Sequence, residues 1–196
     1  MRAPEPQFRR WKVLLLADAS GSQLLEFAVA LPLLVVFVVG IFDFGEAFNV
    51  KQKLNNTARE AARFAATLPT NDLDAIGTPA SVTAIRDLVE THLQSGRMND
   101  CGLAGQVAVN TPPPAQIWTY TAAGGGCPAP LVLTIDRGYS FQTVLGPNTF
   151  DVMSTHVTLQ YPYRWQFNRV IGLMAPGAIY PGVSLITTDA IMPNME

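Results

Sequence analysis

Residues 21–42, with the sequence GSQLLEFAVALPLLVVFVVGIF, decide which fold this chain can adopt. Within them, Phe27 to Phe42 is a run of sixteen residues without a charge. A membrane-spanning helix needs about 20 residues and at least about 17, so the run spans only with help from its neighbours. Adding residues 24–26 and 43–44 lengthens it enough, and Glu26 then lies at or just inside the membrane boundary. We therefore predict a transmembrane helix over residues 22–44.

The segment before this run predicts how the helix is oriented. Residues 1–21 form a basic leader, and the next basic residues after the run are Lys51 and Lys53. The leader's basic residues are Arg2, Arg9, Arg10 and Lys12. The positive-inside rule places such a leader in the cytoplasm and the rest of the chain outside the membrane.

A cleaved secretory signal is not expected, although residues 17–19 have the A-x-A form of a signal cleavage site. Only residues 13–16 are apolar before that site, and a signal peptide needs an apolar stretch of about 7–15 residues.

Composition limits the function further. The chain has 196 residues, 48% of them hydrophobic and only 14% charged, with a formal net charge of −2. A nucleic-acid-binding protein needs a basic face, and a disordered one needs low hydrophobicity and high charge, so both classes are disfavoured. The two cysteines and two histidines fit no zinc-finger spacing. No cofactor and no metal is predicted.

Beyond the membrane, residues 45–69 predict an amphipathic helical arm. One apolar stripe recurs at helical spacing through Ala47, Val50, Leu54, Ala58, Ala61, Ala65 and Leu68. The opposite face carries Lys51, Asn55, Arg59 and Arg63, and we favour a solvated role for the two arginines over contacts to neighbours. Because the stripe is rich in alanine, a sheet or another helix is expected to pack closely against it.

Residues 70–196 predict an extracytoplasmic α+β domain. Thr78 is the expected N-cap of a second helix that ends at Gly96. Residues 99–130 are rich in Gly and Pro and are expected to be irregular. Cys101 and Cys127 bracket this part and would form a disulfide outside the cytoplasm, while the alternative is two buried thiols.

The rest of this domain predicts an antiparallel sheet of about four strands, with both helices on one face. Candidate strands are residues 131–136, 139–144, 157–167 and 184–191. Pro162 predicts an edge position or a break. Tyr161 and Tyr163 are expected in the core, while Trp165 and Phe167 could lie in the core or form an exposed patch for a partner.

No catalytic motif is evident. The sequence has no G-x-S-x-G, H-E-x-x-H or C-x-x-C. His156 could be combined with some Ser and Asp as a catalytic triad, but any sequence of this length offers such a combination. Asp72 and Asp74 could bind a cation, but such a pair more often solvates a loop. A membrane-tethered hydrolase is therefore a remote third reading, and we predict a non-catalytic protein.

The junction at residues 21–27, GSQLLEF, resembles the processing signal of type IVb prepilins and of tight-adherence pilin-like proteins. The resemblance implies that a prepilin peptidase cuts after Gly21. Ser22 would become the N-terminal residue and Glu26 the fifth, followed by the aromatic Phe27. The new amine at Ser22 could pair with Glu26 of the same chain or of a neighbour. The alternative is that Glu26 only marks the end of the helix at the lipid headgroups.

A wider stretch resembles the TadE and TadG-like pilus assembly proteins. The matching pieces are Gly21, Glu26-Phe27-Ala28, Leu31-Pro32, Gly40-Ile41, Asp43 and Ala58 to Arg63. The resemblance implies a minor pilin or pseudopilin with a pilin-like shape in the bacterial inner membrane. Its partners would be a prepilin peptidase, an inner-membrane secretion platform and other pilin-like subunits. The alternative is an unprocessed single-pass protein whose disulfide loop recognises a ligand or an envelope component.

Overall fold

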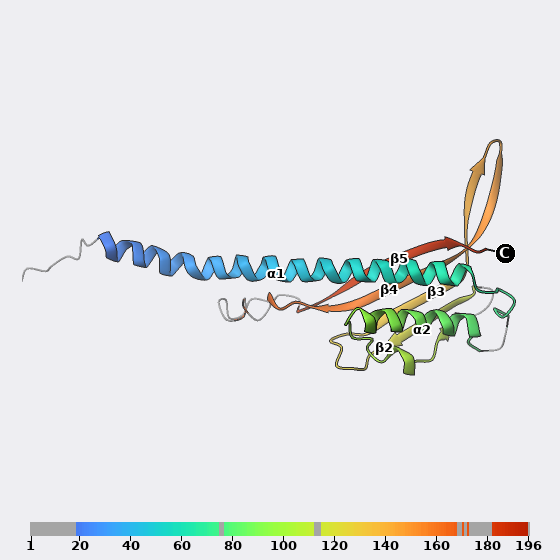
Figure 1. The fold of residues 1–196 in the computed structure, drawn as a ribbon, viewed down its shortest axis with the longest axis horizontal. Helices are drawn as coiled ribbons and strands as arrows, with labels where there is room; N and C mark the ends of the chain where they lie inside the picture. Colours follow the sequence, from blue (N-terminus) through green and yellow to red (C-terminus); the bar gives the residue numbers. More distant parts are fainter. Residues whose placement is uncertain are drawn as a thin grey trace, which may run out of the picture.

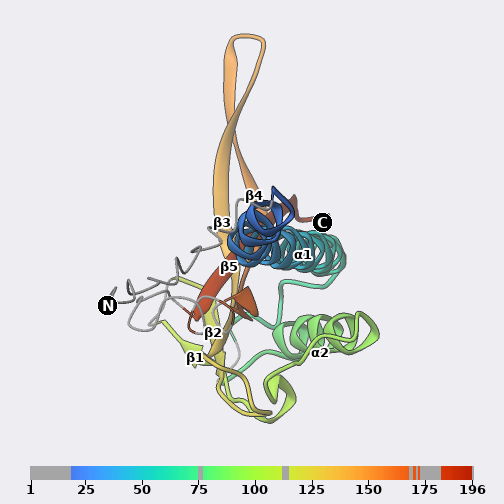
Figure 2. The ribbon, with the colours of Figure 1, turned by 90° about the vertical axis from the view of Figure 1, so that its left-hand side faces the viewer.

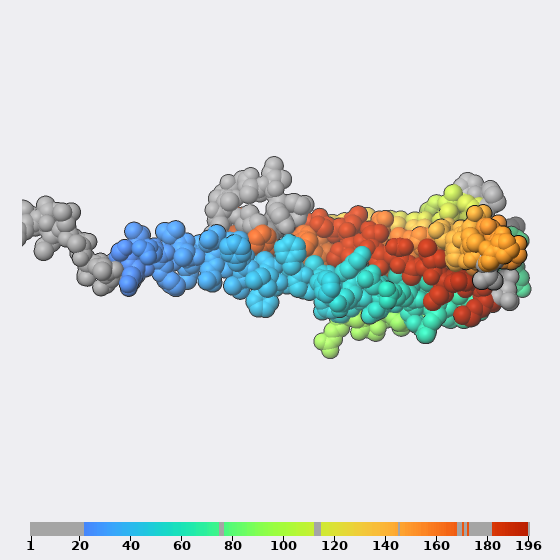
Figure 3. Space-filling model, turned by 90° about the horizontal axis from the view of Figure 1, so that it is seen from above, coloured from blue at the N-terminus to red at the C-terminus, as the bar shows by residue number. Residues whose placement is uncertain are grey.

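The computed structural model describes residues 19–74, 77–111, 115–167, 170, 172 and 182–195. The first element, α1 (Ala19–Ala66), is a single helix of 48 residues, about 72 Å long at 1.5 Å per residue. Its N-terminal half projects beyond the rest of the molecule (Figures 1 and 3). We call the described residues from 70 onward the head. The leader's basic residues and two of the three residues of the A-x-A site lie outside the described residues.

The head is a small antiparallel sheet with one further α-helix. Its elements are α2 (Ala80–Ser95), the 3-10 turn η1 (Leu103–Gly105), β1 (Val109–Asn110), β2 (Ile117–Ala122), β3 (Leu131–Leu145), β4 (Asn148–Arg164) and β5 (Val183–Pro193). Each strand pairs antiparallel with the next, so the order is β1-β2-β3-β4-β5. The predicted α+β class, with a long first helix, a short second helix and an antiparallel sheet, is confirmed, and the sheet has five strands.

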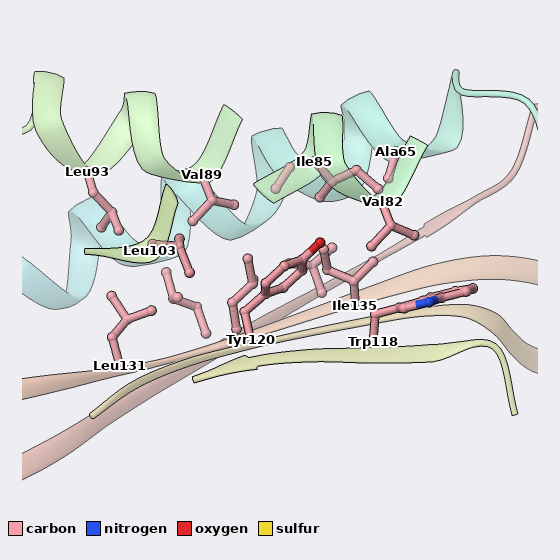
Figure 4. Close-up of a cluster of buried hydrophobic side chains, with 14 of the residues drawn as sticks. Ala65, Val82, Ile85, Val89, Leu93, Leu103, Trp118, Tyr120, Leu131 and Ile135 are labelled. Atoms are coloured by element: carbon pink, nitrogen blue, oxygen red, sulfur yellow. The ribbon is translucent and has the colours of Figure 1, made fainter. Parts of the chain in front are cut away.

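Both helices lie on the same face of the sheet, as expected (Figure 2). The side chains between them form one buried cluster, in which Trp118 and Tyr120 of β2 lie under Val82, Ile85 and Val89 of α2 (Figure 4). The alanine stripe of α1 is fully or almost fully buried at Ala58, Ala61, Ala62, Ala65 and Ala66. Their small side chains allow the close packing that the sequence predicted.

The polar side of α1 is not wholly solvated. The Lys51 ammonium donates to the backbone carbonyl of Thr187 on β5, and the Thr188 hydroxyl donates to the Asn55 side chain. The arm therefore also contacts the last strand through residues predicted to lie on its open face. Arg59 and Arg63 are exposed, as favoured, and Arg63 pairs with Glu60 at 2.7 Å.

Two predictions about α2 and its surroundings were wrong. Pro79, and not Thr78, is the N-cap residue, and it makes no side-chain cap hydrogen bond. The carboxylate of Asp72 takes the place of a side-chain N-cap. It accepts hydrogen bonds from the Ser81 N–H at 2.8 Å and from the Ser81 hydroxyl at 3.0 Å. Residues 99–130 are also not irregular throughout, because they contain β1 and β2.

The strand boundaries differ from the predicted ones. The two candidates at 131–136 and 139–144 are one strand, β3, with a register shift between Asp136 and Tyr139. β4 begins nine residues before Val157 and ends at Arg164, so Trp165 and Phe167 are not part of the strand. Pro162 lies where β4 pairs with β5 but no longer with β3, whose last partner is Gln160, so it has the edge position that was predicted.

Beyond the register shift, β3 and β4 leave the sheet as a two-stranded ribbon, residues 140–153. This ribbon projects sideways from the body of the molecule (Figures 1 and 2). Most of its side chains are exposed, including the apolar Phe141, Val144, Phe150 and Met153.

The end of α1 is fastened to the head by backbone and charged contacts. Arg137, only 1% exposed, donates from Nη2 to the carbonyls of Leu68 and Pro69 at 3.0 and 3.4 Å. The N–H of Met195 donates to the carbonyl of Ala66 at 2.9 Å. The Met195 N–H satisfies one of the carbonyls that the end of a helix leaves open, and Arg137 holds the two carbonyls of the turn that follows the helix.

Candidate functional site

The proposed processing junction lies in the first turns of α1. Gly21 and Ser22 have helical backbone, and the Ser22 hydroxyl donates to Glu26 Oε1 at 3.3 Å. Glu26 and Phe27 are both exposed and are followed only by apolar residues up to Phe42. A carboxylate in such a setting costs roughly 2.5–3.5 kcal/mol on membrane insertion scales, so it needs a partner. Cleavage and pairing at these residues stay predictions.

The helix surface after this junction can face lipid. Among the described residues there is one helix long and apolar enough to cross a membrane, and its most apolar window has no buried residue. The length and the composition of the helix are the two properties that make it able to cross a membrane. Pro32 lies inside α1 without interrupting it. The N-terminal apolar helix is thus consistent with a single-pass anchor.

A second polar site lies where the apolar run ends, and sequence reasoning did not find it. Asp43 is only 4% exposed, although it belongs to the projecting helix. Its Oδ1 accepts from the Tyr163 hydroxyl at 2.8 Å, and its Oδ2 accepts from the Phe167 N–H at 2.8 Å. The same hydroxyl also lies 3.2 Å from the Asp43 carbonyl oxygen. The head therefore holds the carboxylate of Asp43 on both oxygens.

The electrostatics of this contact favour an un-ionised tyrosine. Burial is the largest cause that raises the pKa of Tyr163 above its usual range. The hydrogen bond to Asp43 and the charges of Asp43 and Glu46 raise the pKa of Tyr163 further. Tyr163 is thus a lasting donor to Asp43 at neutral pH.

Aromatic side chains surround this contact. The Trp165 ring meets the Phe44 ring edge-on at 5.2 Å and the Tyr163 ring at 5.0 Å between centroids. Its indole N–H donates to the Ser184 hydroxyl at 2.8 Å. The Phe167 ring lies 3.6 Å from the position that a Cβ on Gly40 would occupy. The two aromatic residues whose place was left open therefore lie against α1.

The two cysteines form the disulfide that was predicted. Cys101 and Cys127 are joined, with Cα atoms 5.6 Å apart. The Gly124 N–H donates to the Cys101 carbonyl at 2.8 Å, and the Asn99 side-chain amide donates to the Gly125 carbonyl at 2.6 Å. The bond joins the Gly-rich turn before β3 to the turn between α2 and η1.

His156 does not have the geometry of a triad. Its Nε2 lies 3.3 Å from Asp189 Oδ2 and also 3.3 Å from the Thr158 hydroxyl. A catalytic histidine contacts its carboxylate and its nucleophile through different ring nitrogens, whereas these two contacts share one. Asp72, suggested with Asp74 as a cation pair, accepts two hydrogen bonds from Ser81 at the start of α2. No cluster of three metal-ligating side chains occurs among the described residues.

Comparison with known proteins finds one segment of the chain similar to a known family. Residues 21–63 match the family model described as TadE-like protein, which confirms the resemblance seen in the sequence. The match runs from the junction glycine through the apolar run to the arginine one turn before the end of α1. Searches of curated proteins and of solved structures gave no match.

Proposed function

Because residues 21–63 are a TadE-like segment, we propose that this chain is a membrane-anchored minor pilin or pseudopilin that takes part in assembling a tight-adherence pilus. The observation that carries the proposal is the form of the matched segment. It is an exposed apolar helix that continues without interruption as an arm whose alanine-rich face is buried against the head. Such a subunit can occupy a membrane with one half of the helix and carry a folded domain on the other.

Processing is the first step of the proposed function. A prepilin peptidase removes residues 1–21 by cutting after Gly21, and Ser22 becomes the N-terminal residue. The positive amine of Ser22 is then one helical turn from Glu26, since residues four apart lie on the same helix face. This amine supplies the partner that a carboxylate on an apolar helix requires.

Assembly is the proposed role of Glu26 and Phe27. Glu26 pairs with the Ser22 amine of its own chain or of a neighbouring subunit, and this pairing sets the register between packed helices. Phe27, exposed on the helix beside Glu26, packs against the helix of the neighbouring subunit next to this pair. The partners are other pilin-like subunits and an inner-membrane secretion platform.

The proposed location is the bacterial inner membrane, with the N-terminus in the cytoplasm and the head outside it. The excess of basic residues before the apolar run supports this orientation. The disulfide between Cys101 and Cys127 also supports it, because disulfides persist in oxidising compartments. The TadE-like pilus-assembly family is generally non-catalytic, and assembly requires no catalytic residue of this chain.

Intact-mass measurement and N-terminal sequencing of the protein from host membranes test the proposal. We expect a mature chain that starts at Ser22, and we expect Gly21→Leu to retain the full length. The matched control is Gly45→Leu, a change to another glycine of α1 whose Cβ position has open space. It should leave the cleavage intact.

Other start sites would contradict the processing step. A chain that starts at Met1 overturns it and favours an unprocessed anchor whose head binds a ligand or an envelope component. The exposed ribbon and the disulfide-closed turn would then be the surfaces to test first. A start at Ser20 means instead that residues 17–19 are read as a signal cleavage site.

A further inference from the structure

The first charged residue after the apolar run is buried against the head. Asp43 is the only charged residue between Glu26 and Glu46, and it lies one residue before the end of the predicted span, 22–44. Its carboxylate is instead turned inward and held by Tyr163 and Phe167 of the head. Glu46 is the next acidic residue and is exposed.

This burial lengthens the helix surface that lipid can accept. Because Asp43 is buried, the helix surface without an exposed charge runs over residues 27–45, which is about 28 Å at 1.5 Å per residue. The hydrocarbon core of a bilayer is about 30 Å thick, whereas residues 27–42 alone cover only about 24 Å. Phe44, 62% exposed, belongs to the added part. The contact with the head thus makes up the length that the apolar run lacks.

The same contact places head residues at the depth of the helix's last apolar turn. Phe167 packs against Gly40, which precedes Asp43 by less than one turn. An apolar groove on this side is lined by Val36, Phe37, Gly40, Ile41, Phe44 and Phe167. Trp165 lies beside it with its indole N–H bound to Ser184. Tryptophan with an apolar ring and a polar contact is enriched where a membrane meets water.

The geometry points to a second membrane contact: Phe44, Trp165 and Phe167 form an interfacial patch that enters the headgroup boundary of the leaflet on the head's side. The ligand is the lipid bilayer that holds α1, because the patch continues the helix's own lipid-facing surface without an exposed charge between them. The head consequently lies on the membrane and is not held away from it on a free stalk. The inference rests on the part of the proposed function that makes α1 a membrane span, and on no other part.

Tryptophan quenching in vesicles tests the patch. The full chain with Trp11→Phe is reconstituted into phosphatidylcholine–phosphatidylglycerol vesicles whose acyl chains carry bromine either near the headgroup end or near the methyl end. The matched control adds Trp165→Phe, so that only Trp118, 1% exposed in the core, still emits. Neither substitution changes a residue of the buried core cluster. The difference between the two emissions isolates Trp165.

We expect the shallow bromines to quench the Trp165 emission more strongly than the deep ones, and both to leave the control unchanged. Equal emission loss in the two proteins overturns the patch. Quenching of Trp165 only by the deep bromines overturns its place at the interface. If the quenching of Trp165 weakens as the protein-to-lipid ratio rises, a second copy of the chain covers the patch. This result overturns the lipid contact.

A third variant separates this inference from the proposed function. Phe37→Trp, added to the control, places a reporter on the exposed apolar part of α1. Deep quenching at this position, together with an unquenched Trp165, shows that the helix spans and that only the patch is wrong. Absence of quenching at position 37 shows that α1 does not span, which overturns both.

Discussion

At the residue scale, the Asp43–Tyr163 pair joins the head to the projecting helix where the apolar run ends. A buried carboxylate that keeps two short hydrogen bonds loses little on leaving water, whereas one without donors is costly. Sequence reasoning placed Asp43 correctly at the end of the apolar run but could not supply its partners. Tyr163 is 120 residues away, and no local periodicity reports such a distance.

Tyr163→Phe should lower the free energy of unfolding of the head by about 1.5–3 kcal/mol, the usual range for a hydrogen bond to a charged group. It should also remove a pH dependence. The folded-state pKa of Tyr163 is raised above the unfolded value of about 10. Its contribution is therefore complete below pH ~10 and is lost as the pH rises through the folded-state value. Urea unfolding in detergent micelles at several pH values measures both effects.

The control for this prediction is Tyr139→Phe, which keeps a ring 5.0 Å from the His156 ring. It should leave both the stability and the alkaline pH dependence close to those of the parent protein. Similar losses in the two variants would show that the Tyr163 hydroxyl has no special role.

At the element scale, the sheet shows why some strands were predicted and others were not. The sequence of β4 alternates over 157–163, and burial follows this alternation at Val157 and Leu159, where one face of the strand lies on the core. β2 alternates too, with Trp118, Tyr120 and Ala122 buried and Thr119 and Thr121 between them. That signal was available, but it covers only six residues between Gly- and Pro-rich stretches. The register shift between Asp136 and Tyr139 has no local signal in the sequence, and Arg137 within it contacts Leu68, which is 69 residues away.

The ribbon should be dispensable for folding. Replacing residues 141–152 by Asn-Gly keeps Ser140 and Met153 paired and removes mainly exposed side chains. A two-stranded ribbon alone is marginally stable, and surface changes usually stay within about 0.5 kcal/mol. We therefore expect an unchanged urea midpoint.

Leu133→Ala is the comparison for the ribbon, because it alters the same strand where it is fully buried. It should cost about 2–5 kcal/mol. A comparable loss on shortening the ribbon would show that the ribbon supports the core.

At the scale of the whole molecule, two halves of one helix have different surroundings. The first half of α1 projects and is apolar (Figure 3), and the second packs one face against the sheet and α2. The sequence predicted this division, because an uncharged run and an amphipathic stripe are long and regular patterns. It did not predict that Lys51 and Asn55 contact β5, since the stripe defines only one packed face.

Glu26→Gln should separate processing from assembly. The amide keeps the size and removes the charge that pairs with the Ser22 amine, so we expect a mature chain starting at Ser22 but few pili. N-terminal sequencing and counts of surface pili by electron microscopy measure the two outcomes. Glu46→Gln changes an exposed carboxylate of the same helix and should affect neither. Normal pilus numbers with Glu26→Gln would remove Glu26 from the assembly mechanism.

The two fastenings of α1 have a mechanical consequence. The Asp43 contact lies at one end of the packed half, and the Ala66–Met195 hydrogen bond lies at the other. Between them α1 runs alongside β4 and β5 (Figure 1). A pull along the helix axis therefore loads this interface in shear, so its contacts share the tension and none is peeled away first. The head can be dragged by its anchor as one rigid body.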